Sequence, residues 1–213
     1  MRVIGRWALW ALISLVVITV LFRAIALRWW RVPDDDPYLE ASIAPTLRGG
    51  DLVLLWRLTP PGLGQLVLCP EPKHASRETI GRMVGEEEET VVVEGSRVTI
   101  DGRAYATEGS CANKRFKVAA PQNGSELEQT CSLEVANGLL HERGNAESSA
   151  DVTRLEIKIG EGEVALVSDN RRFPYDSRDF GPVSRQTCKE TVFFRVVGSQ
   201  GFFDSATRFQ YIR

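Results

Sequence analysis

The chain opens with a long uncharged segment and continues as shorter runs in which apolar and polar residues alternate. Residues 7–22 carry no charge, and after Arg23 the apolar run continues to Leu27. As one helix this segment would span about 31 Å, close to the thickness of a bilayer's hydrocarbon core. The pattern predicts a membrane-spanning helix over residues 7–28, preceded by a short tail over residues 1–6.

A cleaved signal peptide is the alternative interpretation of this segment. The small residues Ala24 and Ala26 are followed by LRWWR and give no clean cleavage site, which favours an anchor. Trp29 and Trp30 suit the headgroup layer, where indole rings concentrate. Arginines flank the run on both sides, so the positive-inside rule does not give the orientation. A polar linker over residues 29–37 then leads to the rest of the chain.

Beyond the linker the pattern is mostly that of β-strands. Strands are expected in five apolar or alternating stretches: 51–58, 64–69, 90–105, 154–167 and 192–198. The stretch 90–105 contains two turns with glycine and predicts three consecutive strands. The stretch 154–167 predicts a hairpin that turns at residues 160–162. The sequence therefore predicts a mainly β domain over residues 38–213.

Residues 106–152 interrupt this pattern with a polar stretch of weak periodicity, and they predict a variable inserted subdomain. Cys111 and Cys131 flank its polar part and could form a disulfide outside the cytosol, whereas unpaired small apolar side chains are the alternative. No two of the four cysteines have C-x-x-C spacing, and His74 and His141 form no H-E-x-x-H motif. The spacing therefore predicts no metal site and no cofactor.

The charge distribution limits the class of partner. Five of the 26 basic residues precede the first acidic residue, Asp34, which leaves 21 basic against 28 acidic residues and a net charge of −7 for the remainder. An acidic domain without a basic stripe argues against nucleic acid as a partner.

Three stretches concentrate residues that could support chemistry. SIAPTL (42–47) runs into GDLVL (50–54), IGRMVG occupies 80–85, and SDNRRFPYDSRDFG occupies 168–181. Alone, Ser42 would be most simply a capping or turn serine. In this order behind one anchor, the stretches resemble the boxes of the signal peptidase I family, membrane-bound serine endopeptidases that remove signal peptides from exported proteins.

The resemblance covers the anchor and most of residues 38–105 and 154–195. It implies a single-pass membrane protein whose β-rich domain rests on the extracytoplasmic face. The implied substrate is an extended signal-peptide segment with small residues before the cut, added as a strand to a sheet edge beside the serine. The implied chemistry pairs a serine with a lysine whose pKa burial lowers, so that the neutral amine acts as the base.

Carried over residue by residue, the catalytic roles of the family are mostly lost. Ser42 stands in the nucleophile position. Gly81 stands in the general-base position and has no group to accept a proton. Pro174 replaces the serine that would orient the amine, and it has no hydroxyl. Glu40 replaces the hydroxyl that would hold the oxyanion with the Ser42 backbone, and its carboxylate would repel negative charge.

The framework of the family motifs is retained by contrast. It comprises Pro45, Asp51, Arg82, Gly85, Asp169, Asn170, Arg171, Asp176, Ser177, Arg178 and Gly181. Asp176 and Arg178 are expected to hold the late loop in place. Asp169 and Asn170 are expected to shape the wall near the serine.

Three other residues are weaker candidates for a base. Lys73 and His74 lie in a loop upstream of the base position. Glu40 would share a face with Ser42 along an extended strand, although a carboxylate is a weak base for an alcohol. Three hypotheses therefore remain for the chain. It is an active endopeptidase with a base that the motifs do not reveal, or a non-catalytic homologue that binds or regulates exported peptides. The third is a membrane-tethered structural protein.

Overall fold

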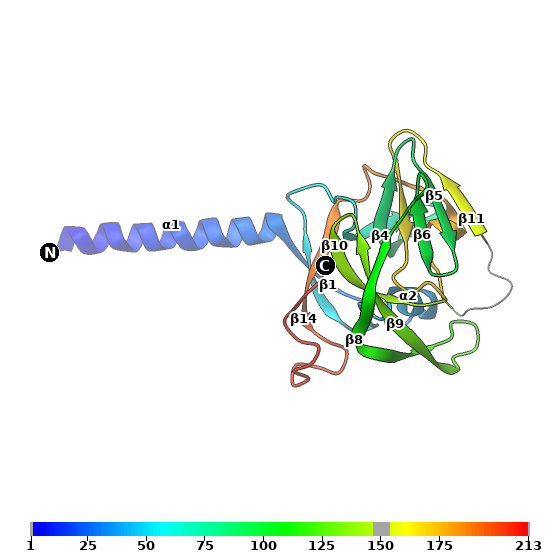
Figure 1. Ribbon diagram of the computed structural model, residues 1–213. Helices are drawn as coiled ribbons and strands as arrows, with labels where there is room; N and C mark the ends of the chain where they lie inside the picture. Colours follow the sequence, from blue (N-terminus) through cyan, green and yellow to red (C-terminus); the bar gives the residue numbers. More distant parts are fainter. Residues whose placement is uncertain (1, 147–153, 213) are drawn as a thin grey trace.

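The structure, a computed structural model, describes residues 2–146 and 154–212, and it consists of one long helix and a β domain (Figure 1). Helix α1 (Arg2–Ala26) projects from the domain as a rod. Its exposed segment Leu9–Ala26 is long and apolar enough to cross a membrane, as predicted. The helix begins at Arg2, within the tail expected over residues 1–6.

Strand β1 (Leu27–Arg31) follows α1 directly and pairs with β2 (Leu52–Trp56), so the expected linker begins inside the β domain. Trp30 is 8% exposed and packs in the core, where its Nε1 donates to Glu78 Oε2 at 2.9 Å. The prediction that Trp30 lies in the headgroup layer is therefore wrong. Apolar burial and a hydrogen bond within the domain hold this indole instead.

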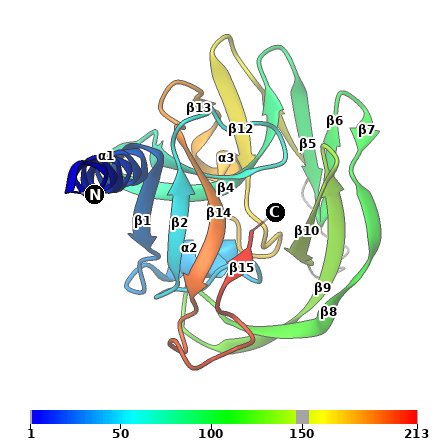
Figure 2. The ribbon, with the colours of Figure 1, turned by 90° about the vertical axis from the view of Figure 1, so that its left-hand side faces the viewer.

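The largest sheet has eight antiparallel strands in the order β1-β2-β14-β3-β4-β12-β13, with β15 paired to β14. The strands after β2 are β3 (Leu66–Glu71), β4 (His74–Glu86), β12 (Glu163–Val167), β13 (Val183–Ser184), β14 (Glu190–Val197) and β15 (Gln210–Tyr211). Figure 2 shows β1, β2 and β14 side by side. A disulfide that the spacing did not predict joins Cys69 on β3 to Cys188, 119 positions apart in the sequence.

A second sheet has the order β11-β5-β6-β7. It contains β5 (Thr90–Glu94), β6 (Arg97–Ile100), β7 (Arg103–Ala104) and β11 (Arg154–Lys158). The three consecutive strands predicted over 90–105 are confirmed, and the β6–β7 turn places Asp101 and Gly102 at φ +47° and +80°, which suits Asp-Gly. The hairpin predicted over 154–167 is wrong, because β11 pairs with β5 whereas β12 pairs with β4.

The polar stretch after β7 forms a third sheet of three long strands in the order β10-β9-β8. These are β8 (Ala106–Ala119), β9 (Glu126–Ala136) and β10 (Leu139–Gly144). Their periodicity is weak in the sequence because most of β8 is exposed and its register shifts between Ser110 and Arg115. The disulfide expected between Cys111 and Cys131 is present. Residues 147–152 of the predicted insertion lie outside the described residues.

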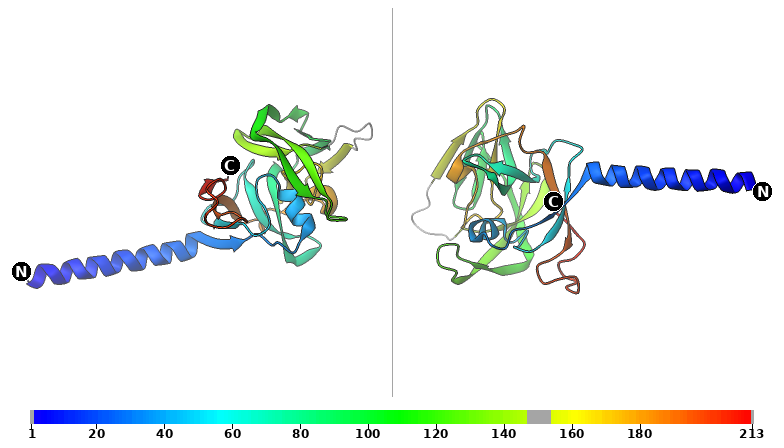
Figure 3. Two further views of the ribbon diagram at one scale, coloured as in Figure 1. Left: turned by 90° about the horizontal axis from the view of Figure 1, so that it is seen from below. Right: turned by 180° about the vertical axis from the view of Figure 1, so that it is seen from behind.

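Helix α2 (Pro37–Ile43) lies between the first and third sheets (Figure 3). Leu39 and Ile43 pack into the core of the large sheet. Ala41 and Ala44 pack on the other side, in a cluster with Cys111 and other apolar residues of β8 and β9. Because both sides of α2 are covered, Ser42 within it is fully buried. A short helix, α3 (Ser177–Phe180), follows the loop after β12.

Candidate active site

Ser42 lies in the last turn of α2, a helix whose N-terminus carries a capping residue and a proline. The Asp36 carboxylate caps it by accepting hydrogen bonds from the backbone N–H of Tyr38 and Leu39, both at 3.1 Å, and Pro37 occupies the first turn. The Ser42 hydroxyl donates to the Leu39 carbonyl at 2.8 Å. This contact is the only hydrogen bond of the hydroxyl within the described residues.

The backbone of Ser42 is held by the late loop. The Asn170 N–H donates to the Ser42 carbonyl at 2.9 Å. The Asn170 side chain is fixed in turn by two hydrogen bonds with Gln129 of β9, at 2.8 and 3.1 Å. Asn170 therefore connects the candidate nucleophile to the third sheet, and Gln129 is a residue that the sequence motifs did not indicate.

Gly81 lies on β4, opposite Val67 of β3. A Cβ at Gly81 would meet the Leu166 Cβ at 3.0 Å, and the next two nearest atoms belong to the Val167 backbone. All three atoms are on β12, and none is on Ser42. The position expected for the base thus carries no side chain, and the space beside it is filled by an apolar residue.

Glu40 does not share a face with Ser42, because residues 37–43 form a helix and not the extended strand that was expected. Two residues apart in a helix, the side chains point about 200° apart. Glu40 lies instead beside Gly49, whose added Cβ would be 3.2 Å from the Glu40 Cδ. The Ser–Glu pair considered from the sequence therefore does not form.

The remaining candidate bases have other partners. The Lys73 amine donates to the Asp179 carbonyl at 3.2 Å. The His74 Nδ1 lies 2.7 Å from the Glu71 carboxylate, and most of the His74 side chain is exposed. Pro174 lines a cleft of about 440 Å³ beside Tyr175. Within the described residues, no titratable side chain is hydrogen-bonded to the Ser42 hydroxyl.

Beneath the site lies a fully buried ion pair. The Arg82 Nε and Nη2 donate to the two oxygens of Asp169, each at 2.9 Å, and both side chains have no exposed area. Thr46 also donates to this carboxylate, at 2.5 Å. Burial, the largest single effect, would raise the pKa of Asp169. The Arg82 charge, the neighbouring His141 and the hydrogen bonds from Arg82 and Thr46 together hold that pKa below its usual range.

The late loop is held by a second set of charges. Asp176 pairs with Arg178 at 2.6 Å and accepts the Ser168 N–H, also at 2.6 Å. Arg171 pairs with Glu134 of β9, which Arg143 also contacts at 2.6 Å. Burial, the largest single effect, would raise the pKa of Glu134, but the Arg171 charge together with His141 and Arg143 lowers it on balance. Glu134 and Arg143 belong to the predicted insertion, whose polar composition gave no sign of a buried role.

His141 completes this charged cluster without a hydrogen bond of its own. Its Nε2 lies 3.3 Å from Glu134 and 3.8 Å from Asp169, and neither ring nitrogen has a partner in hydrogen-bond geometry. Burial, with the Arg82 charge second, lowers the pKa of His141, so the ring is neutral at pH 7.

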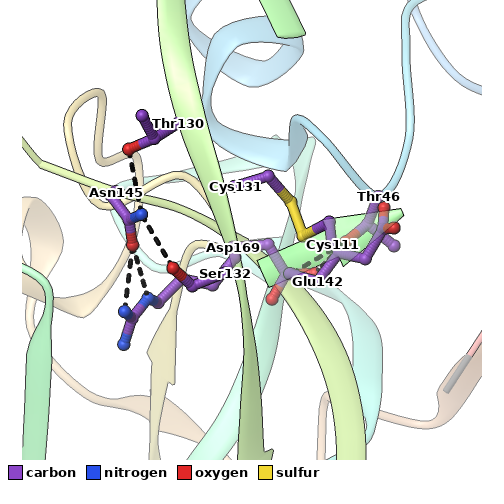
Figure 4. Close-up of a disulfide and its surroundings, with 9 residues drawn as sticks. Thr46, Cys111, Thr130, Cys131, Ser132, Glu142, Asn145 and Asp169 are labelled. Atoms are coloured by element: carbon purple, nitrogen blue, oxygen red, sulfur yellow. Dashed lines mark hydrogen bonds between the residues drawn. A yellow bond between two sulfur atoms is a disulfide. The ribbon is translucent and has the colours of Figure 1, made fainter. Parts of the chain in front are cut away.

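One group of residues has the composition of a cation site. Cys111, Cys131 and Glu142 lie together on the third sheet, with Thr46 and Asp169 nearby (Figure 4). The two cysteines are joined as a disulfide, so their sulfur atoms are not thiolates in this state.

The chain thus combines an exposed apolar helix, long enough to cross a membrane, with a β domain that has a buried serine at its start and a charged loop near its end. The family model described as "Signal peptidase, peptidase S26" matches residues 4–197, and the chain belongs to that family. The family gives the chain a signal-peptidase-like function at a membrane. A comparison with curated proteins found no match.

Proposed function

We propose that this chain is a membrane-anchored signal peptidase homologue that binds signal-peptide segments of exported proteins and does not cleave them by serine–lysine chemistry. The observation that carries the proposal is the state of the Ser42 hydroxyl, which is buried and donates to the Leu39 carbonyl, with glycine at the base position. A serine hydroxyl becomes a nucleophile when a neighbouring base takes its proton. A neutral carbonyl does not take it.

The expected loss of rate is large. A positioned base contributes roughly 10²–10⁴ in rate, and one oxyanion donor roughly 10²–10³. These losses need not multiply, because groups that act together are not additive. Even the smaller figure, about 10², would leave only about one hundredth of the rate.

A cleft beside α2 supports the binding half of the proposal. It has a volume of about 720 Å³ and lies between the start of α2 and β4, with Tyr38 and Leu39 on one wall and Arg77 and Glu78 on the other. One edge of β4 pairs with β3 along the first half of the strand, and the opposite edge pairs with β12 only from Arg82 onward. Before Arg82, no strand of the described chain pairs with this opposite edge. An extended peptide added there would complete the backbone hydrogen bonds of β4.

The two disulfides support an extracytoplasmic position for the β domain, since disulfides persist in oxidising compartments. We propose that α1 spans the membrane once and holds the cleft near the surface from which exported chains emerge.

A binding titration tests this function. The full chain in detergent is titrated against a fluorescently labelled signal-peptide segment, and fluorescence anisotropy is measured. We expect saturable binding that Tyr38→Ala weakens about tenfold, equivalent to 1.4 kcal/mol. Tyr211→Ala removes a tyrosine that is 74% exposed and outside this cleft, and it should leave the affinity unchanged. Absence of saturable binding, or equal loss in both variants, would contradict the proposal and favour a structural role.

A further inference from the structure

The disulfide on the third sheet has a carboxylate beside it. The sulfur atoms of Cys111 and Cys131 and a Glu142 carboxylate oxygen all lie within 4.8 Å of one another. We propose that, once this disulfide is reduced, the two thiolates and the carboxylate bind one thiophilic divalent cation of the Zn²⁺ type. This inference does not depend on the peptide-binding function.

The fold brings one ligand from each of three adjacent strands. Cys111 is on β8, Cys131 on β9 and Glu142 on β10. Glu142 lies opposite Leu133, and Cys131 is two residues from Leu133 on the same face of β9, so Glu142 and Cys131 are diagonal neighbours. The irregular register of β8 between Ser110 and Arg115 places Cys111 with its Cα 5.4 Å from that of Cys131.

The Glu142 carboxylate is available as a ligand. Its backbone carbonyl is 3.5 Å from the Thr46 hydroxyl, whereas its carboxylate has no hydrogen bond or ion pair in the described part of the chain. Glu142 and Cys131 both line a cleft of about 760 Å³. Figure 4 shows Glu142 alongside the disulfide. The cleft leaves room for water as a fourth ligand.

The chemistry of the donors selects the class of cation. Two thiolates, a carboxylate and water form a tetrahedral set of the kind that Zn²⁺ accepts, with one exchangeable position. Thiolates favour soft cations over Mg²⁺ or Ca²⁺. The second disulfide, Cys69–Cys188, belongs to no such group within the described residues, so the property is specific to the third sheet.

The change of state balances as a two-electron reduction. A dithiol reductant supplies two electrons and two protons, its own sulfurs become a disulfide, and the Cys111–Cys131 bond becomes two thiols. The cation then displaces both thiol protons to solvent. The covalent link between β8 and β9 is thereby replaced by a metal link that also includes β10, and this sheet packs against α2 through Ala41 and Ala44.

Cadmium binding to the full chain in detergent tests the site, with thiolate-to-cadmium absorption in the ultraviolet as the readout. After reduction and removal of the reductant under anaerobic conditions, we expect one Cd²⁺ per chain with this absorption. Glu142→Gln should weaken binding at least about tenfold, since even the loss of an outer partner of a ligand costs 10–100-fold. Glu128→Gln is the matched control, because Glu128 is an exposed carboxylate on β9, and it should bind like the unmodified chain.

Two further samples make the outcome decisive. The oxidised chain should lack the tight site. The reduced chain carrying Cys111→Ser and Cys131→Ser should also lack it, although this double variant still contains Cys69 and Cys188. Absence of the absorption after reduction would overturn the proposal. So would equal affinity in Glu142→Gln, or a tight site that survives in the double cysteine variant.

Discussion

Arg82 and Asp169 form a two-point ion pair whose side chains have no exposed area, with Nε–Oδ1 and Nη2–Oδ2 distances of 2.9 Å. Arg82 lies on β4 next to Gly81, and Asp169 lies in the loop after β12. The next residue in this loop, Asn170, donates its backbone N–H to the Ser42 carbonyl. These contacts thus fix the polar surroundings of Ser42, whose hydroxyl has no titratable hydrogen-bond partner within the described residues.

Breaking this pair should destabilise the fold strongly. Arg82→Met leaves the Asp169 carboxylate buried without its main partner, and we expect a loss of about 3–5 kcal/mol in the free energy of unfolding. Arg115→Met removes one member of an exposed pair with Glu128 and should cost less than about 1 kcal/mol. Denaturant titration of the full chain in detergent measures both. Equal losses would show that the buried pair contributes no more to the free energy of unfolding than the exposed pair.

Stability should fall with acidification in two stages. Because the pKa of Asp169 is lowered in the fold, the unfolded chain binds more protons below about pH 4, and the stability this group contributes is lost as the pH falls further. Asp176 acts in the same direction: burial would raise its pKa, and Arg178 lowers it on balance. Both contributions are fully present above the unfolded pKa.

His141 adds the earlier stage of this decline. Its lowered pKa means that the unfolded chain gains a proton first, from about pH 6.5 downward, and stability is lost across that window. His141→Gln should therefore flatten the stability curve between pH 7 and pH 5 when each protein is normalised to its value at pH 8. An unchanged decline in the variant would exclude His141 as its cause.

A side chain at Gly81, the position expected for the base, should be poorly tolerated. Gly81→Ala puts a Cβ 3.0 Å from the Leu166 Cβ, and we expect a loss of about 1–3 kcal/mol from overpacking. Gly81→Lys meets the same obstacle and should not restore cleavage, since Pro174 and Glu40 also remain. Gly62→Ala is the control, because its nearest neighbour would be 4.0 Å away, at the end of the Gln65 side chain. Similar stability of both alanine variants would argue against crowding at Gly81.

The sequence predicted the helix, most strands and the family because these depend on local patterns. The apolar run of α1 and the Asp101-Gly102 turn are examples that need no tertiary information. The partner of β11 was mispredicted because adjacency in sequence favours a hairpin, whereas Ile157 on β11 packs with Val91 and Val93 of β5.

The buried polar contacts of the site were harder to predict. The motifs indicated Asp169 and Asn170, but not Gln129 or Glu134, which reach the site from a stretch that is mostly exposed. Trp30 was misplaced because an indole after an apolar helix suits a bilayer interface and a domain core equally well by composition. Long-range packing decides between the two, and one sequence does not record it.

Cleavage of a labelled pre-protein by the full chain in detergent, compared with Ser42→Ala, shows whether the Ser42 hydroxyl acts as a nucleophile. We expect the two proteins to release the same background amount of mature product, since the Ser42 hydroxyl has no group to take its proton. Cleavage well above background that Ser42→Ala abolishes would contradict the account and establish an active peptidase.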